Sequence, residues 1–105
     1  IDGVEPPRTV PTTTKASWFV YVGRLDPGVD RTRVIERLQT RGVPSRPYFP
    51  PIHLQPHYAA TYGHRPGDLP VTEAEASRTL ALPFHGKLSD VDVDYVCEVL
   101  RWGLV

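Results

Sequence analysis

The 105-residue sequence predicts an α+β fold in which a small, mainly antiparallel sheet packs against helices. One segment is rich in the aromatic and β-branched residues typical of strands. Later segments carry helix-capping residues in front of apolar stripes, and short extended segments separate them. The expected order is strand, helix, strand, loop, two helices, strand and helix. A chain of this length fits one small domain.

The first sixteen residues differ sharply from those that follow. Residues 1–16 hold three prolines and a run of threonines without apolar periodicity, which predicts a linker. The domain is therefore expected to span residues 17–105. Its first segment, 17–25, predicts a strand. Apolar residues occupy both of its faces, Trp18, Val20 and Val22 on one and Phe19 and Tyr21 on the other. We therefore expect both faces to be covered.

The next helix has a start and a stop signal. Asp30 is placed to cap a helix that runs to about Arg41, and Gly42 provides its C-terminal stop. Its apolar stripe comprises Val34, Ile35 and Leu38. Many of the twelve prolines follow, and they exclude regular sheet or a long helix from the middle of the chain. We expect an extended piece at 45–49, a proline-bounded loop and a short helix at 57–62.

The last third of the chain predicts two more helices around a short strand. Thr72 and Glu75 have capping-box spacing for a helix that ends near Arg78, and 79–82 is a strand candidate. Ser89 is expected to cap the terminal helix, with acidic residues in its first turn. The expected core stripe of this helix is Val93, Val96, Cys97 and Leu100, and a second stripe is Tyr95, Val99 and Trp102.

Composition excludes several classes of function. The 12 Lys and Arg residues balance 12 Asp and Glu residues, which argues against a nucleic-acid-binding module. No apolar run approaches the roughly 20 residues that span a bilayer, and no signal peptide is expected at the N-terminus. The single cysteine, Cys97, excludes an internal disulfide and suits the reducing cytoplasm.

Residue types that carry chemistry do not form a catalytic set, so no catalytic, cofactor-binding or metal-ligating residue is predicted within the chain. His53 and His57 are four residues apart, but Pro56 lies between them and no cysteine is near. Cys97 falls on the apolar face of a predicted helix, where packing is its expected role. Both lysines lie in polar segments that do not suit a Schiff base.

The densest segment is 45–58, where prolines stiffen a loop that carries Arg, Tyr, His and Gln. Rigid loops with such side chains are favoured places for ligand contact. The alternative is structural: Tyr48, Phe49 and Ile52 anchor the loop in the core, and His53 fixes it. On the chemistry of the residues alone, both interpretations stay open.

Three motifs resemble those of the DegT/DnrJ/StrS-type sugar aminotransferases. Residues 48–56, YFPPIHLQP, closely resemble that family's Y-x-P-P-x-H-L-Q-P stretch. Residues 67–73, GDLPVTE, are similar to its G-D-x-P-V-x-E, and 80–84, LALPF, to its short L-x-L-P strand. The resemblance covers about residues 16–102, and three motifs in the right order make it specific.

The resemblance implies the C-terminal small domain of a fold-type I enzyme that uses pyridoxal phosphate. Such enzymes move an amino group from glutamate to a nucleotide-linked keto sugar, and their products enter polysaccharides and antibiotics. They are homodimers whose cofactor lysine lies in the large domain, which this chain lacks. The resemblance therefore implies that residues 1–16 lead from that large domain and that the fragment is inactive alone.

The same resemblance places Tyr48 and His53 near the sugar-nucleotide pocket, with Gln55 as a further substrate-binding candidate. Arg46 precedes the motif and is a candidate for a phosphate contact. Two alternatives remain. A non-catalytic α+β ligand-binding or regulatory module predicts that Tyr48 and His53 are buried. A dehydratase of the same family would carry histidine in place of the cofactor lysine.

Overall fold

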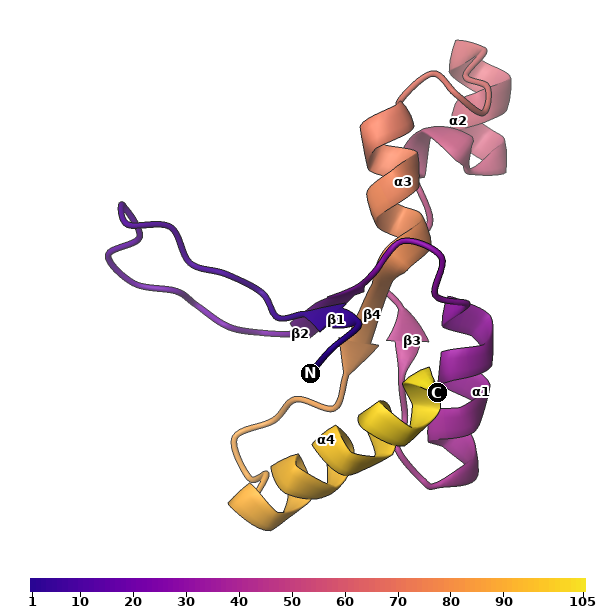
Figure 1. Ribbon diagram of the computed structural model, residues 1–105. Helices are drawn as coiled ribbons and strands as arrows, with labels where there is room; N and C mark the ends of the chain where they lie inside the picture. The colour runs from indigo at the N-terminus through magenta and orange to yellow at the C-terminus, as the bar shows by residue number, and fades with distance from the viewer.

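The computed structural model describes all 105 residues and contains a four-stranded sheet, four α-helices and one 3-10 turn. The strands are β1 (Val4–Glu5), β2 (Tyr21–Leu25), β3 (Arg46–Pro47) and β4 (Thr79–Leu82). They lie in the order β1-β2-β4-β3, and every neighbouring pair is antiparallel. The predicted α+β class with its small antiparallel sheet is confirmed (Figure 1).

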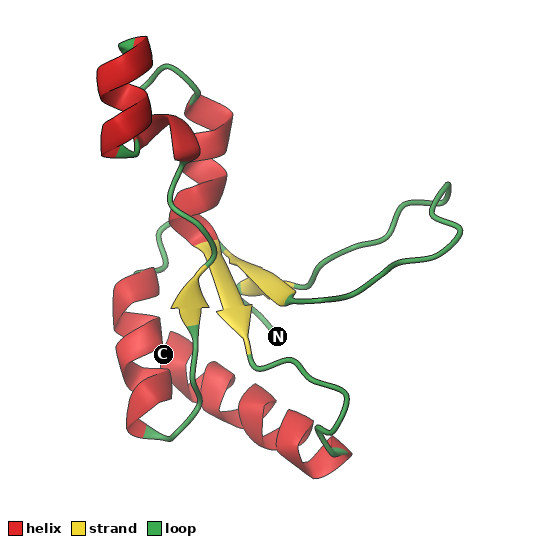
Figure 2. Cartoon of the chain, turned by 180° about the vertical axis from the view of Figure 1, so that it is seen from behind, coloured by secondary structure: helices red, strands yellow, loops and turns green.

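The register gives the sheet one apolar and one polar face. Gly23 pairs with Leu80 and Leu25 with Val4, so these side chains share a face. Helices α1 (Arg31–Thr40) and α4 (Asp90–Leu104) pack on that face (Figure 2). Together they bury a core of Leu25, Val34, Leu38, Val43, Leu80, Val99 and Leu100. The other face carries Arg24, paired with Glu5 on one side and Thr79 on the other.

Both of these helices begin where the sequence predicts. The Asp30 carboxylate accepts the Arg33 backbone N–H at 3.1 Å, which satisfies one of the free donors in the first turn of α1. Ser89 and Asp92 form a reciprocal capping box: the Ser89 hydroxyl accepts from the Asp92 N–H at 3.2 Å, and Asp92 accepts from the Ser89 N–H at 2.9 Å. These local signals are therefore confirmed.

The predicted core stripe of α4 is partly wrong. Of that stripe Leu100 is buried but Val93 is 47% exposed, and of the second predicted stripe Val99 is buried but Tyr95 is 47% exposed. Gly103, in neither stripe, is buried as well. The reason is that the C-terminal half of α4 packs against α1, whereas Tyr95 in the N-terminal half contacts only the end of α1, where its hydroxyl donates to the Arg41 carbonyl at 2.9 Å. A side chain at Gly103 would come within 2.7 Å of Leu38 Cδ1. The N-terminal half of α4 extends beyond α1 and leaves its apolar residues exposed (Figure 1).

The first long strand is shorter than predicted, because residues 17–20 have no strand beside them. β2 starts at Tyr21, and Trp18 and Phe19 are 47% and 80% exposed. Within this chain, the expected cover on both faces of residues 17–20 is therefore incomplete. Residues 6–20 form an arm that projects from the sheet (Figures 1 and 2). Before it, Val4 and Glu5 pair with β2, so part of the segment expected as a linker belongs to the sheet.

The middle of the chain builds a tip, defined here as residues 52–69. It comprises the 3-10 turn η1 (Ile52–Leu54), which was not predicted, helix α2 (Pro56–Tyr62) and the loop that follows. Helix α3 (Pro70–Arg78) connects the tip to β4. The predicted capping box of α3 is wrong. Pro70 opens the helix two residues earlier than Thr72, as proline favours the first helical position, and Leu69 is its N-cap.

The arm and the tip make the molecule open in shape. Its radius of gyration is 15.7 Å, whereas a compact chain of this length has about 13 Å. None of the helices combines the length and the apolar composition that a bilayer-spanning segment requires. Much aromatic surface remains exposed, including Trp18, Phe19, Phe49 and Tyr62.

Candidate functional site

The candidate site is centred on the proline-rich loop between β3 and η1. Of the predicted extended piece 45–49, only Arg46 and Pro47 pair with β4. The Thr79 hydroxyl then donates to the Tyr48 carbonyl at 3.2 Å, which ties the loop to the start of β4. The next residue, Phe49, has a left-handed backbone with φ of 52°. This conformation is costly for a bulky residue and redirects the chain into the two prolines.

The four predicted substrate-binding residues lie in different surroundings. Arg46 is exposed in β3 and makes no ion pair, and Gln55 is exposed at the N-cap of α2. Tyr48 is half-buried, with its ring centroid 4.5 Å from that of Phe49. His53 is only 5% exposed. The four residues are thus neighbours in sequence but differ in exposure. None of them lines the groove of about 470 Å³ beneath the loop.

The structural interpretation of this loop is half right. Phe49 and Ile52 are 66% and 60% exposed, so they are not the core anchors it expects. His53 does fix the loop, because its Nε2 lies 2.9 Å from Glu73 Oε1. The Glu73 carboxylate also accepts backbone N–H bonds from Gly67 at 2.9 Å and Leu69 at 3.3 Å. These bonds, and first of all the one from His53, lower the pKa of Glu73.

Sequence reasoning missed Glu73 although a signal for it was present. Glu73 closes the GDLPVTE motif, and His53 lies in the YFPPIHLQP motif. No pattern in either motif indicates that these two side chains meet. The structure joins the two motifs through this single carboxylate. Of the other histidines, His57 and His85 are exposed, while the His64 ring packs edge-on against His53 with centroids 5.8 Å apart.

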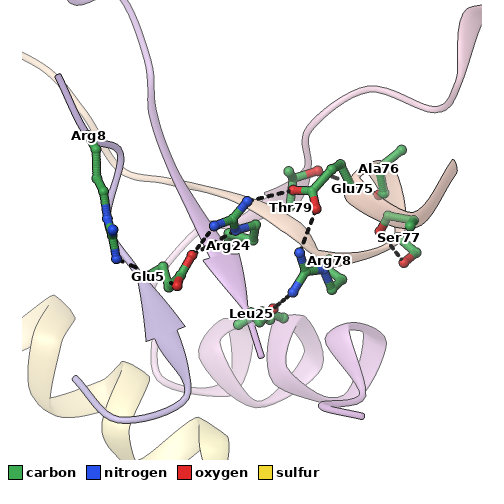
Figure 3. Close-up of polar contacts among 10 residues, drawn as sticks. Glu5, Arg8, Arg24, Leu25, Glu75, Ala76, Ser77, Arg78 and Thr79 are labelled. Carbon is green, nitrogen blue, oxygen red and sulfur yellow. Dashed lines mark hydrogen bonds and ion pairs between the residues drawn. The ribbon is translucent and has the colours of Figure 1, made fainter. Parts of the chain in front are cut away.

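A second polar cluster, a chain of alternating charges, crosses the open face of the sheet (Figure 3). Arg24 donates from Nε to Glu5 at 2.9 Å and from Nη1 to Glu75 at 3.1 Å. Arg78 donates to Glu75 at 2.5 Å and to the Leu25 carbonyl at 3.3 Å. The hydrogen bond from Arg24 is the main cause that lowers the pKa of Glu5, and that from Arg78 is the main cause for Glu75. The charges are matched pairwise, which suits a fastening role between β1, β2 and α3.

Neither cluster provides a metal-binding site or a nucleophile. No group of three or more His, Cys, Asp or Glu side chains is arranged to hold a metal ion. Cys97 is half-buried and lines an apolar groove of about 340 Å³ between β4 and the N-terminal half of α4. Lys15 and Lys87 are exposed and make no ion pair. What the chain offers chemically is therefore a set of hydrogen-bonding and aromatic side chains on a stiff loop.

Comparison with known proteins gives consistent matches. The DegT/DnrJ/EryC1/StrS aminotransferase family model matches residues 1–101. GDP-perosamine synthase of Caulobacter vibrioides is 38% identical over 100 residues, which are 91% of this chain and 26% of that protein. The spore coat polysaccharide biosynthesis protein SpsC of Bacillus subtilis is 34% identical over 81% of this chain and 23% of its own length.

Solved structures agree. The aminotransferase TlmJ from Streptoalloteichus hindustanus is similar with a TM-score of 0.81 and 36% identity, over 99% of this chain and 27% of that chain. The PMP-form of the putative sugar aminotransferase Spr1654 from Streptococcus pneumoniae gives 0.86 and 26% identity, over 96% and 26%. The chain thus spans about a quarter of the length of these relatives. It belongs to the DegT/DnrJ/EryC1/StrS aminotransferase family.

Proposed function

We propose that this chain is the C-terminal part of a pyridoxal phosphate-dependent aminotransferase that moves an amino group from glutamate to a nucleotide-linked keto sugar. The observation that carries the proposal is the match to the aminotransferase family over residues 1–101, together with the similarity to TlmJ over nearly the whole chain. Two relatives are named as a GDP-perosamine synthase and a dTDP-sugar 4-aminotransferase, which supports a sugar nucleotide as the substrate class.

The open shape supports a role within a larger protein. Trp18 and Phe19 on the arm and Val93 and Tyr95 on α4 are exposed although they are apolar or aromatic. Exposed apolar surface of this kind marks places where further protein packs. We propose that a large domain covers part of it, that residues 1–16 lead from that domain to β2, and that the enzyme works as a cytoplasmic homodimer.

The chain's own residues do not fit a cofactor site. Its lysines are exposed. Asp30 caps the N-terminus of α1, and Asp90 and Asp92 lie in the first turn of α4, where their negative charges oppose a phosphate group. Pyridoxal phosphate, which the PMP-form and PLP-form structures of Spr1654 indicate for that relative, would thus be held by residues outside this chain. The task of this chain is to contact and orient the sugar nucleotide.

Four side chains are proposed for that task. Arg46 and Gln55 are exposed and have no partner of their own, so they can donate to phosphate and hydroxyl oxygens of a substrate. Tyr48 is half-buried beside Phe49 and presents a phenol at the same loop. His53 is the exception, because Glu73 already holds its Nε2.

The test uses the full-length protein that carries this chain. Purified protein should absorb as a pyridoxal phosphate enzyme and change its spectrum on adding glutamate. It should then convert a nucleotide-linked keto sugar to an amino sugar detectable by mass spectrometry. A product that has lost a hydroxyl group and gained no nitrogen would indicate the dehydratase alternative. A colourless protein that gives no product contradicts the proposal.

The burial of His53 favours one further candidate, a non-catalytic ligand-binding or regulatory module. This candidate predicts that His53→Ala lowers the free energy of unfolding rather than a catalytic turnover. The absorbance spectrum of the full-length protein distinguishes this candidate from the aminotransferase, since a regulatory module carries no cofactor absorbance. Tyr48 distinguishes less, because it is only half-buried.

A further inference from the structure

The Glu73 carboxylate, which α3 carries, bonds more groups of the tip than any other side chain does. Oε1 accepts from His53 Nε2 at 2.9 Å, from the Gly67 N–H at 2.9 Å and from the Leu69 N–H at 3.3 Å, while Oε2 also accepts from Gly67. The Glu73 side chain is 22% exposed and that of His53 5%. One side chain thus joins η1, the loop after α2 and the first turn of α3.

This arrangement determines which nitrogen of the His53 ring faces the carboxylate with a proton. The ionised carboxylate can only accept hydrogen bonds, so Nε2 must carry the proton that lies between the two residues. In the neutral imidazole this leaves Nδ1 as the acceptor. Glu73 therefore determines which edge of His53 donates and which accepts. The Nε2 edge is no longer free to contact a ligand.

We call the hydrogen bonds of Glu73 with His53, Gly67 and Leu69 the clasp. Apolar packing does not hold the tip in its place. Helix α2 and helix α3 contain no buried residue, and Ile52, Tyr58 and Tyr62 of the tip are 60%, 40% and 67% exposed. The other charged groups around Glu73 are His64 and Asp68, which approach each other to 3.6 Å, and Arg31, which lines the groove beneath the loop with Glu73. None of these three side chains bonds the Glu73 carboxylate, whereas His53 does.

We propose that Glu73 and His53 are a positioning pair: Glu73 holds His53 and the 66–69 turn so that the loop presents Tyr48 and Gln55 to the sugar nucleotide. The pair acts through the loop and does not itself touch the substrate through Nε2. This inference rests on the proposed function for its substrate, but the geometry of the pair is independent of it. His53 is thereby moved from the set of substrate contacts to the set that orients them.

The first test measures the clasp without any activity. Full-length protein carrying 15N-labelled glycine and leucine is titrated with acid, and the amide proton shifts of Gly67 and Leu69 are followed by NMR. We expect both to titrate with a midpoint below the ordinary glutamate value of 4.5, because they donate to Glu73. Glu73→Gln should abolish this titration, and His53→Asn should move its midpoint upward.

Glu36→Gln, on the exposed side of α1, is the matched control and should leave both amide titrations unchanged. Amides of Gly67 and Leu69 that titrate in Glu73→Gln as in the wild type would show that Asp68, not Glu73, governs them. That result would overturn the clasp. Wild-type amides that do not titrate at all would overturn it as well.

The second test separates positioning from mere stability. In the holoenzyme, Glu73→Gln should raise KM for the sugar nucleotide about tenfold or more, since misplacing an orienting group weakens substrate alignment. The cofactor spectral change with glutamate alone, and kcat at saturating sugar nucleotide, should stay within about twofold of wild type. An unchanged KM together with a lost amide titration would refute the positioning role. A wild-type enzyme without aminotransferase activity would refute the proposed function and leave the clasp standing.

Discussion

The core region and the tip of this molecule are held together by different forces. Around β2, β4, α1 and α4, side chains such as Leu25, Leu38 and Leu80 are fully buried. In the tip, no apolar side chain is buried, and residues up to twenty positions apart are joined by hydrogen bonds to Glu73. Burial of apolar surface supplies most of the core's contribution to the free energy of unfolding, and a cavity in the core lowers that free energy. The tip depends instead on charge, tautomer and proline stiffness.

This difference has a functional meaning. A ligand-facing loop that is packed by apolar contacts would have few polar groups left to offer. The tip keeps Gln55 and His57 exposed because its conformation is fixed by one carboxylate and by prolines at both ends of η1. Its shape is expected to respond to pH and to single polar substitutions, whereas the core is expected to respond to volume.

The largest effect is expected from removing core volume. Leu80, in β4, is 0% exposed. It belongs to the apolar core to which α1 and α4 both contribute side chains. Leu80→Ala should lower the free energy of unfolding by about 3 kcal/mol, within the 2–5 range typical of buried leucines. Urea denaturation followed by circular dichroism measures it. A loss below about 1 kcal/mol would mean that the core contributes little more than the tip.

Removing the N-cap hydrogen bond of α4 should lower the free energy of unfolding by less than the core substitution does. Ser89→Ala removes the hydroxyl that accepts the Asp92 N–H at the start of α4. We expect a loss of about 1 kcal/mol in the free energy of unfolding, the usual effect of deleting an N-cap side chain. Ser77→Ala is a suitable control, because its hydroxyl only donates within α3 to the Ala74 carbonyl. Equal losses for both variants would contradict the capping account.

Acid should weaken the attachment of α3, the helix that carries the tip, to β1 and β2. The folded-state pKa values of Glu5 and Glu75 lie below the ordinary 4.5, so the folded chain binds fewer protons than the unfolded one. Their stabilisation is complete above pH 4.5 and is lost as the pH falls through the lowered folded values. In Arg24→Met, stability measured by urea denaturation should depend less on pH in this window. Added salt should reduce the difference between variant and wild type at neutral pH.

The smallest effect is expected at Phe49, where the loop leaves the core region. Phe49→Asn loses a ring that is already 66% exposed and gains a residue that tolerates a φ of 52°. We expect a change below about 1 kcal/mol in the free energy of unfolding. Phe49→Val, which cannot adopt this backbone conformation readily, should destabilise more. The reverse order would show that the ring, not the backbone, sets the loop.

The same division explains what the sequence could predict. Capping at Asp30 and Ser89 and the strand at 79–82 depend on neighbours in sequence, and all are confirmed. The extent of β2 depends on which distant strand lies beside it, so residues 17–20 were wrongly included. The contacts of Glu73 with His53 and of Arg24 with Glu75 join residues 20 and 51 positions apart. The motif resemblance singled out His53 and covered the segment that holds Glu73, but it gave Glu73 no role and did not reveal that the two side chains meet.

Amide hydrogen exchange in wild type and Glu73→Gln tests the contrast between the two regions most directly, because it reports local opening residue by residue. We predict faster exchange confined to the tip and the first turn of α3, with the amides of β2 and β4 unchanged. If Leu80 and its neighbours exchange faster to the same extent, or if no amide of the tip changes, the two regions are not held independently and the account is wrong.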